Sequence, residues 1–302
     1  MTDHHYEIAG IVVLHDPVHA RLDQVNHLAG LVGHLYLVDN TPAGFDALTA
    51  LGQQSSLTII VNRNKGGLAG AYNNAIERIG IEQPNTTHIL FLDEDSDIAA
   101  LSSFLDSPVT HDALAQADVA AVAPLYVEKA TGLPGAHIQL RRFTYRVLPR
   151  ELTEATEVSF LINSMSLWAY SAIKKIGQHS TVLGVDHVDT DYCLRANQLG
   201  YRLILNPTVR FQHTIGARKA YRLFGRTLQS GGHSPARREM IGRNTAILAK
   251  RFALYYPSFV LLCISRICYE CLGIIIIENK KLKKLTSTLK GTATGLYTKY
   301  HS

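Results

Sequence analysis

The sequence predicts an α/β fold in which helices flank a mostly parallel sheet. Short apolar runs alternate with segments of helical spacing through the first two thirds of the chain, and this alternation is typical of successive βαβ units. Polar and acidic residues follow directly on the ends of several apolar runs. Because ligands bind at the carboxyl ends of parallel strands, this pattern also predicts where the functional site lies.

The composition is that of a globular protein with a charge asymmetry. The 302 residues are 46% hydrophobic and 18% charged, enough to form a large core. Residues 210–302 carry 17 Lys and Arg against three Asp and Glu, whereas residues 1–209 carry 13 against 22. An acidic body with a basic C-terminal region favours an anionic partner for that region, such as a phosphate, a lipid headgroup or a nucleic acid.

Cysteine usage indicates a reducing compartment. Cys268 and Cys271 form a single Cys-x-x-Cys pair with no second pair in the sequence, so we predict a buried thiol pair here. Residues 1–7 are polar and show no signal peptide.

Four apolar runs predict the first strands of the sheet. These are Ile8–Leu14, His34–Val38, Leu57–Val61 and His88–Leu92. Helical spacing predicts intervening helices over 17–31, 45–51 and 68–79. Right-handed crossovers make such strands parallel. The polar residues after the strands are therefore expected at one rim: Asp16, Asp39, Asn64 and Asp93.

The middle of the chain continues the pattern. We predict a strand over 118–126, a hairpin over 137–148, a short helix over 170–176 and a helix entered from the acidic loop at Asp186. Two more strands are expected over 201–205 and 209–213. The segment 158–168 is apolar with Asn163, Ser164 and Ser166 interspersed; it either lines a pocket or forms a strand.

The C-terminal region reads as three helices, over 236–254, 257–277 and 280–290. The second is apolar enough to approach a spanning helix, but Arg266 and Glu270 interrupt it. With the basic third helix, this pattern favours an interfacial membrane anchor, and the alternative is a helical pair that packs on the core or on a second subunit. We therefore divide the chain into a catalytic domain, 1–215, and a helical C-terminal region, 216–302, for membrane association, acceptor binding or oligomerisation.

The acidic cluster Asp93–Asp97 follows the fourth predicted strand directly. Clustered carboxylates favour a hard divalent cation, although a solvated acidic turn has the same composition. An EF-hand is excluded, because that loop needs Gly and a later Glu where this chain has Ile98 and Phe104.

Several motifs occur together in a specific order along residues 8–251. They are Asp39-Asn40, Asn64-x-x-Gly67, Leu92-Asp93-Glu94-Asp95-Ser96, Asp186-x-x-Asp189-x-Asp191-Tyr-Cys-Leu-Arg, His213 and His233-Ser234-Pro235. This set resembles the inverting family 2 glycosyltransferases of the GT-A fold, in their bacterial rhamnosyltransferase branch. The Thr-Tyr-Asn type of triplet that the family shows after the first strand is replaced here by Leu14-His15-Asp16-Pro17.

The resemblance implies roles for particular residues. It places the metal ligands at Asp93, Asp95 and His213, with Mn²⁺ or Mg²⁺ as the cation, and the catalytic base at Asp189, with Asp186 as the second candidate. Contacts to the donor nucleotide are expected from a wider set: Asp39, Asn64, Gly67, Asp93, Glu94, His233 and Arg237. The last two form a basic group with Arg238 and Arg243. This group holds either the donor diphosphate or a lipid-linked diphosphate, or it is a solvated basic helix face.

The predicted function is transfer of L-rhamnose from dTDP-rhamnose to a glycan acceptor, expected to be lipid-linked, in bacterial surface polysaccharide synthesis. The expected location is the cytoplasmic face of the plasma membrane, with a possible homo-oligomer and no nucleic-acid partner. A family 2 transferase of another sugar, such as galactofuranose or a UDP-hexose, is the nearest alternative. A metal-dependent phosphohydrolase and a non-catalytic sugar-binding scaffold are the remaining ones.

Overall fold

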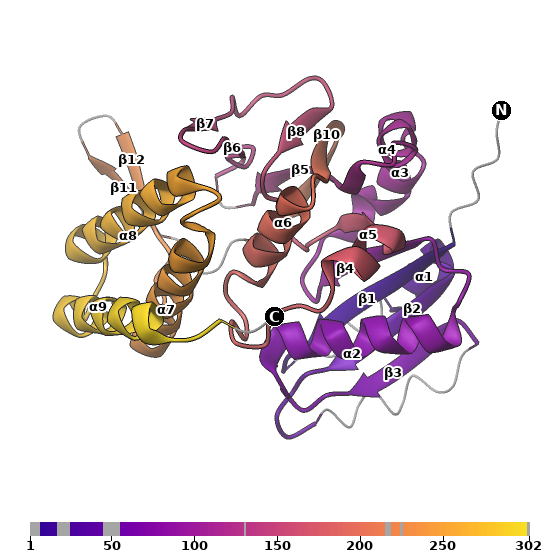
Figure 1. Cartoon of the computed structure of the whole chain (residues 1–302), viewed down its shortest axis with the longest axis horizontal. Helices are drawn as coiled ribbons and strands as arrows, with labels where there is room; N and C mark the ends of the chain where they lie inside the picture. The colour runs from indigo at the N-terminus through magenta and orange to yellow at the C-terminus, as the bar shows by residue number, and fades with distance from the viewer. Residues whose placement is uncertain are drawn as a thin grey trace.

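A computed structural model describes residues 7–16, 25–44, 55–129, 131–214, 219–223 and 226–300. Its centre is an eight-stranded sheet with the order β3-β2-β1-β4-β9-β5-β10-β8 (Figure 1). The first four of these strands are parallel, and β9 is antiparallel to both of its neighbours. The predicted α/β class with a mostly parallel sheet is confirmed.

The predicted N-terminal strands are all present. They are β1 (Ile8–Leu14), β2 (His34–Asp39), β3 (Leu57–Val61) and β4 (His88–Asp93). β1 and β4 lie in the interior of the sheet, and their residues 9–14 and 89–92 are buried, as in strands covered on both faces. Of the predicted helix 17–31, α1 (Val25–Leu31) is seen, and residues 17–24 and the predicted helix 45–51 lie outside the described residues.

Two hydrophobic cores cover the two faces of the sheet. One face packs against α2 (Gly67–Glu82), α5 (Tyr170–Ile176) and α6 (Val188–Gln198). The other face packs against α1, α3 (Leu101–Leu105) and α4 (Pro108–Leu114), with the short helix η3 (Ile98–Ala100) before them. The acidic segments after β4 and before α6 therefore reach the sheet edge from different layers.

The middle strands follow the prediction with one correction. β5 (Val119–Glu128), β8 (Thr156–Val158) and β9 (Ser166–Ala169) join the main sheet, while β6 (Ile138–Leu140) and β7 (Tyr145–Val147) form the predicted hairpin. The two strands expected over 201–213 are one strand, β10 (Arg202–His213), with a register shift between Asn206 and Arg210. Pro207 has no N–H to donate, and the irregularity accommodates it without ending the strand.

A second hairpin was not predicted. β11 (Lys219–Leu223) and β12 (Arg226–Ser230) pair antiparallel with each other, within the segment that the sequence showed only as basic. This hairpin leads into the helical region.

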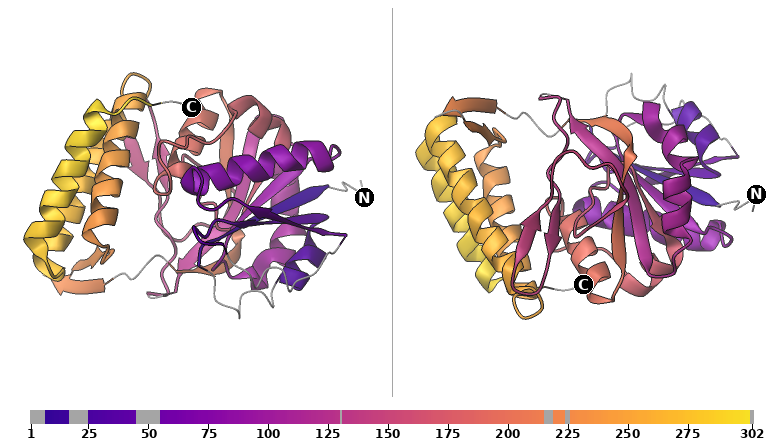
Figure 2. Two further views of the ribbon diagram at one scale, coloured as in Figure 1. Left: turned by 90° about the horizontal axis from the view of Figure 1, so that it is seen from below. Right: turned by 90° about the horizontal axis from the view of Figure 1, so that it is seen from above.

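The three C-terminal helices are confirmed as α7 (Pro235–Phe252), α8 (Pro257–Ile277) and α9 (Lys281–Tyr297). They lie side by side at one flank of the molecule (Figure 2). Glycines let α7 and α9 approach closely, since a Cβ at Gly291 would lie 1.9 Å from the Glu239 carbonyl oxygen. Residues of α7 and α8 also belong to the core on the α2, α5 and α6 side, among them Ile247 and Phe259. The predicted boundary at 215/216 stays a prediction.

The Cys-x-x-Cys pair on α8 is not buried as predicted. Cys268 is exposed and Cys271 is half-buried, whereas the buried thiols are Cys193 and Cys263. The apolar run of α8 does not place every side chain inside, because only one stripe of the helix faces the protein.

Candidate active site

The first acidic segment begins where β4 ends. The Asp93 backbone N–H donates to Ser96 Oγ at 2.9 Å, and the Ser96 N–H donates to the Asp93 carbonyl oxygen at 3.1 Å. These bonds turn the chain sharply after the strand and keep Asp93 at the carboxyl edge of the sheet. Burial, with a smaller contribution from the charges of Asp95 and Glu94, raises the pKa of the Asp93 carboxyl to about 6, against the lowering effect of a hydrogen bond from Ser164.

A loop from a distant part of the sequence contacts Asp93. The Ser164 hydroxyl donates a hydrogen bond to Asp93 Oδ2. Ser164 and Asn163 are buried in the connection between β8 and β9. The strand interpretation of segment 158–168 holds from Ser166 onward, where β9 begins, and a pocket-lining role for Asn163 and Ser164 stays a prediction.

The second acidic segment leads into α6 and comes close to the first. Asp189 lies in the first turn of α6, where its Oδ1 accepts a hydrogen bond from the Thr190 N–H at 2.6 Å. Burial raises the pKa of Asp189, and the Asp93 charge raises it too. Tyr72 of α2 is fully buried beside them, and both carboxylates raise the pKa of its hydroxyl. Asp93 and Asp189, 96 positions apart in the sequence, therefore share one site.

Helix α7 holds the acidic loop in place. The side-chain amide of the buried Asn244 donates to the carbonyl oxygens of Leu183 at 2.6 Å and Asp186 at 2.8 Å. Nε2 of His187 is hydrogen-bonded to Oγ1 of Thr245 at 2.9 Å. Burial lowers the pKa of His187 to about 3, helped by the charge of Arg266 on α8. This histidine is therefore neutral at pH 7 and acts as a support for the loop.

The predicted basic group divides into two parts. Arg237 pairs with Asp186 at 3.2 Å, and burial and the charges of Arg237 and Arg238 lower the pKa of His233. His233, Arg237 and Asp186 are thus brought together beside the acidic loop. Arg238, by contrast, is 1% exposed and bonds to Glu270, Glu278 and Ser230, so it holds the C-terminal helices together.

The predicted nucleotide contacts after β2 and β3 meet at the same sheet edge. The Asn40 amide donates to Asn64 Oδ1 at 3.3 Å, and Asp39 Oδ1 accepts from the Thr41 N–H at 3.0 Å. Glu94 joins them from the first acidic segment, since its carboxylate accepts from the His15 N–H at 2.9 Å. These bonds link the segment after β1 to the one after β4, and the segment after β2 to the one after β3, while contacts of Asp39, Asn64 and Glu94 to a nucleotide stay predictions.

Gly67 has a packing reason of its own. Its φ is +66°, and a Cβ there would lie 2.6 Å from the Gly184 carbonyl oxygen. The backbone therefore makes a close approach between the start of α2 and the acidic loop. A contact from Gly67 to a nucleotide stays a prediction.

The three predicted metal ligands do not form one cluster. Among the described residues, no group of three or more His, Cys, Asp or Glu side chains is placed to hold a metal ion. His213 lies at the end of β10, and its ring packs near Tyr126 at 5.8 Å. The carboxylates of Asp93, Glu94 and Asp95 have the donor chemistry of a divalent cation site, because such an ion would relieve their repulsion, but they are not placed as a ligand cluster in this structure. The assignment of the ligands stays a prediction.

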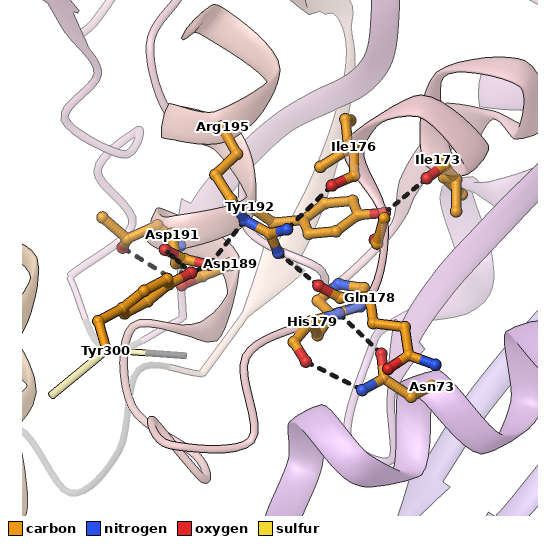
Figure 3. Close-up of polar contacts among 12 residues, drawn as sticks. Asn73, Ile173, Ile176, Gln178, His179, Asp189, Asp191, Tyr192, Arg195 and Tyr300 are labelled. Atoms are coloured by element: carbon orange, nitrogen blue, oxygen red, sulfur yellow. Dashed lines mark hydrogen bonds and ion pairs between the residues drawn. The ribbon is translucent and has the colours of Figure 1, made fainter. Parts of the chain in front are cut away.

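Sequence reasoning missed two residues that support the site. Asn244 and Thr245 each contact the second acidic segment from far away in the sequence, and the sequence carries no local signal for such pairs. Asp191 lies in the first turn of α6. It is 1% exposed and bonded to Arg195 and Tyr300 (Figure 3). Its partner at one helical turn, Arg195, was readable from the i,i+4 spacing.

A mostly parallel sheet with two acidic segments meeting at its carboxyl edge is the arrangement expected of the glycosyltransferase class. No protein-family model matches the chain. The chain is 25% identical over 246 residues to the curated dTDP-rhamnosyl transferase RfbF of Shigella flexneri. The aligned region covers 79% of this chain and 77% of the relative. This relative confirms the predicted resemblance to glycosyltransferases and the predicted enzyme class.

Two solved structures show a looser likeness. GalNAc-T7, crystallised with UDP, GalNAc and Mn²⁺, is 13% identical with a TM-score of 0.48 and covers 90% of this chain. The chain spans 56% of the length of that structure. S. aureus TarS 1–349 is 12% identical, also with a TM-score of 0.48. The match covers 94% of this chain and 71% of the TarS chain. The fold class rests on the strand order described above.

Proposed function

We propose that the protein is a metal-dependent inverting glycosyltransferase that transfers L-rhamnose from dTDP-rhamnose to a glycan acceptor. The observation that carries this proposal is the meeting of Asp93 and Asp189 beside Tyr72 at the carboxyl edge of the sheet. The choice of donor is supported by the similarity to the dTDP-rhamnosyl transferase. An acceptor linked to a lipid diphosphate, in the assembly of a surface polysaccharide, completes the proposal.

Asp189 is the proposed catalytic base. A single inverting displacement needs a carboxylate opposite the leaving group to accept the proton of the acceptor hydroxyl. Asp189 remains partly accessible, yet burial and the Asp93 charge raise its pKa. Both properties suit a base, because a raised pKa makes a carboxylate a better proton acceptor near neutral pH. Asp186 is the weaker candidate, since Arg237 neutralises it.

The acidic turn after β4 is the proposed metal site. Asp93 and Asp95 would hold Mn²⁺ or Mg²⁺, with His213 as the third predicted ligand and Ser164 orienting Asp93. When bound, the cation supplies Lewis-acid neutralisation of the leaving diphosphate. Asp39, Asn64, Gly67 and Glu94 are proposed to bind the nucleoside, and His233 and Arg237 a diphosphate, because all of them border this edge.

The C-terminal helices are proposed to bind a membrane surface from the cytoplasmic side. Within the described residues, α8 is the one helix long and apolar enough to cross a membrane, by length and composition only. It exposes Leu261, Ile264, Leu272 and Ile275. Of its two charged residues, Glu270 bonds to Arg238 and Arg266 is exposed. Interfacial attachment leaves Arg266 in water, whereas a spanning helix would place this charge in the bilayer.

Calorimetric binding tests the donor. The protein is titrated with dTDP-rhamnose, UDP-galactose, UDP-N-acetylglucosamine and UDP-galactofuranose, each with and without Mn²⁺. Metal-dependent binding of dTDP-rhamnose alone is expected. Metal-dependent preference for a UDP-sugar keeps the class and overturns the donor, and no binding to any donor contradicts the proposal.

The product of turnover separates the other classes. Release of phosphate from the nucleotide without sugar transfer indicates a phosphohydrolase. Sugar binding without any turnover indicates a non-catalytic scaffold. Flotation with vesicles of anionic lipid tests whether the C-terminal helices bind a membrane surface. Sedimentation without lipid tests the alternative, in which these helices pack against a second copy of the chain in a homo-oligomer.

A further inference from the structure

The segment after α9 returns to the acidic helix α6. The Tyr300 hydroxyl lies 2.8 Å from both Oδ1 and Oδ2 of Asp191, to which it donates a hydrogen bond (Figure 3). The path of this segment is fixed by α7: Lys250 Nζ donates to the carbonyl oxygens of Leu296 and Thr298, both at 2.7 Å. The Arg251 guanidinium packs over the Tyr300 ring at 5.3 Å. Tyr300 is therefore placed by several contacts from one helix.

Asp191 connects this segment to the loop on the other side of α6. Its Oδ2 accepts from Arg195 Nε at 3.0 Å. Arg195 in turn donates to the carbonyl oxygens of Ile176 at 3.0 Å and Gln178 at 2.8 Å. A buried carboxylate needs its charge matched and its oxygens bonded, and Arg195 and Tyr300 together do this.

The loop that Arg195 holds continues to the interior of the site. His179 stacks on Tyr192 of α6 with ring centroids 3.8 Å apart, and Asn73 of α2 bonds both backbone groups of His179, at 2.7 and 2.9 Å. Tyr72, beside Asn73, carries the hydroxyl that lies near Asp93 and Asp189. The contacts from Tyr300 thus reach the elements that position both carboxylates.

Asp189 and Asp191 occupy the same first turn of α6 but different faces, because residues two apart on a helix do not face the same way. Asp189 interacts with Asp93, while Asp191 interacts with Tyr300. Anchoring Asp191 therefore sets the rotation of this turn and the direction of Asp189. Catalytic groups tolerate little displacement from the productive geometry.

We propose that Tyr300 is a positioning residue that acts through Asp191 to hold Asp189 in place for proton abstraction. This inference rests on the proposed function for the role of Asp189. The C-terminal helices then complete the catalytic site in addition to any contact that they make with a membrane.

The test compares Tyr300→Phe with Tyr297→Phe in the full chain. The first variant removes one hydroxyl and keeps the ring under Arg251. The second is the matched control, since Tyr297 is 88% exposed on the same segment. Loss of one positioning hydrogen bond is expected to lower kcat about tenfold, with KM for the donor nearly unchanged. Tyr297→Phe is expected to match the parent, and a parental kcat in Tyr300→Phe overturns the proposal.

A double-variant cycle distinguishes action through Asp191 from general destabilisation. Asp191→Ala is expected to lower kcat, and adding Tyr300→Phe to it should cause little further loss, because either change alone removes the hydrogen bond between Tyr300 and Asp191. Losses that multiply in the double variant overturn the proposal.

Hydrogen exchange provides a readout that does not depend on sugar transfer. Peptides covering residues 186–195 are expected to exchange faster in Tyr300→Phe than in Tyr297→Phe. If the parent transfers no sugar, the proposed function fails while this comparison still tests the contact. Equal exchange in the two variants contradicts the anchoring of α6 by Tyr300.

Discussion

The side-chain amide of Asn244 on α7 donates a hydrogen bond to the carbonyl oxygen of Asp186, 2.8 Å away, and thereby ties the helical region to the acidic loop. The same amide reaches the Leu183 carbonyl oxygen, and Asn244 is fully buried. Asn244→Ala should leave two buried carbonyl groups without this donor, at a cost of about 1–3 kcal/mol in the free energy of unfolding. Urea unfolding checks the cost, and kcat should fall because the loop carries Asp189. A variant with parental stability would contradict the structural role.

The proposed base is tested with Asp189→Asn. The amide keeps the shape and accepts the Thr190 N–H bond, but it does not take up a proton. Loss of general-base catalysis is expected to lower kcat by about 10²–10⁴-fold, with donor binding retained. Transfer rates and calorimetric donor affinity measure the two effects. Asp186→Asn is the matched control and should retain far more activity, and equal turnover by Asp189→Asn and the parent removes the assignment.

The proposed metal site is tested with Asp95→Ala. Asp95 is partly exposed at the turn after β4, so its removal should leave the fold intact. Donor binding is expected to lose its dependence on Mn²⁺, since one predicted ligand is gone. Asp97→Ala is the control from the same turn, because Asp97 Oδ1 caps the backbone N–H of Ala99. If Asp95→Ala binds the donor with the parental dependence on Mn²⁺, the metal lies elsewhere.

Stability should fall as the pH drops below about 6.5, and His137 contributes. Burial lowers the pKa of His137 to about 4. Between pH 6.5 and pH 4, His137 binds a proton in the unfolded chain but not in the folded protein. The contribution of neutral His137 to stability is therefore complete above pH 6.5 and is lost as the pH falls toward 4. When the pH is lowered from 7 to 4.5, the free energy of unfolding should therefore fall by about 2 kcal/mol less in His137→Phe than in the parent.

Urea unfolding at the two pH values measures this difference. His27→Phe is the control, because His27 is exposed. The buried His88 and His187, with pKa values lowered to about 4 and about 3, leave the remaining acid sensitivity in place. If the difference in the free energy of unfolding between His137→Phe and the parent is the same at pH 7 and at pH 4.5, this prediction is wrong.

The C-terminal helices depend on a buried ionic group. Arg238 bonds to Glu270 and Glu278, and Lys284 bonds to Glu278 as well. Arg238→Met leaves Glu270 without this cation and the buried Glu278 with Lys284 alone, which is expected to cost about 3–5 kcal/mol. Arg237→Met is the matched control, one residue away and half-exposed, and should cost far less. Equal urea midpoints for the two variants would show that the ionic group does not stabilise the helices.

Local patterns were sufficient for most of the fold. The apolar runs of β1 to β4 and the helical spacing of α7 to α9 are local properties, and each predicted element is present where the structure describes it. The prediction failed where local signals conflict with the sheet. Two strands were expected over 201–205 and 209–213, but pairing with β5 continues β10 through the residues between them. The β11–β12 hairpin lay within a basic segment without an apolar run to indicate it.

The sequence by itself determined that the chain is an α/β protein with carboxylates at the ends of parallel strands, because hydrophobic periodicity and strand-end position are properties of neighbouring residues. Tertiary structure decided which of those acids meet. Asp93 and Asp189 share a site, Asp186 pairs with Arg237, and Asp191 turns away toward Tyr300. These partners lie far apart in the sequence and are brought together by the packing of helices and sheet. The spacing of residues along the sequence does not show which of them will meet.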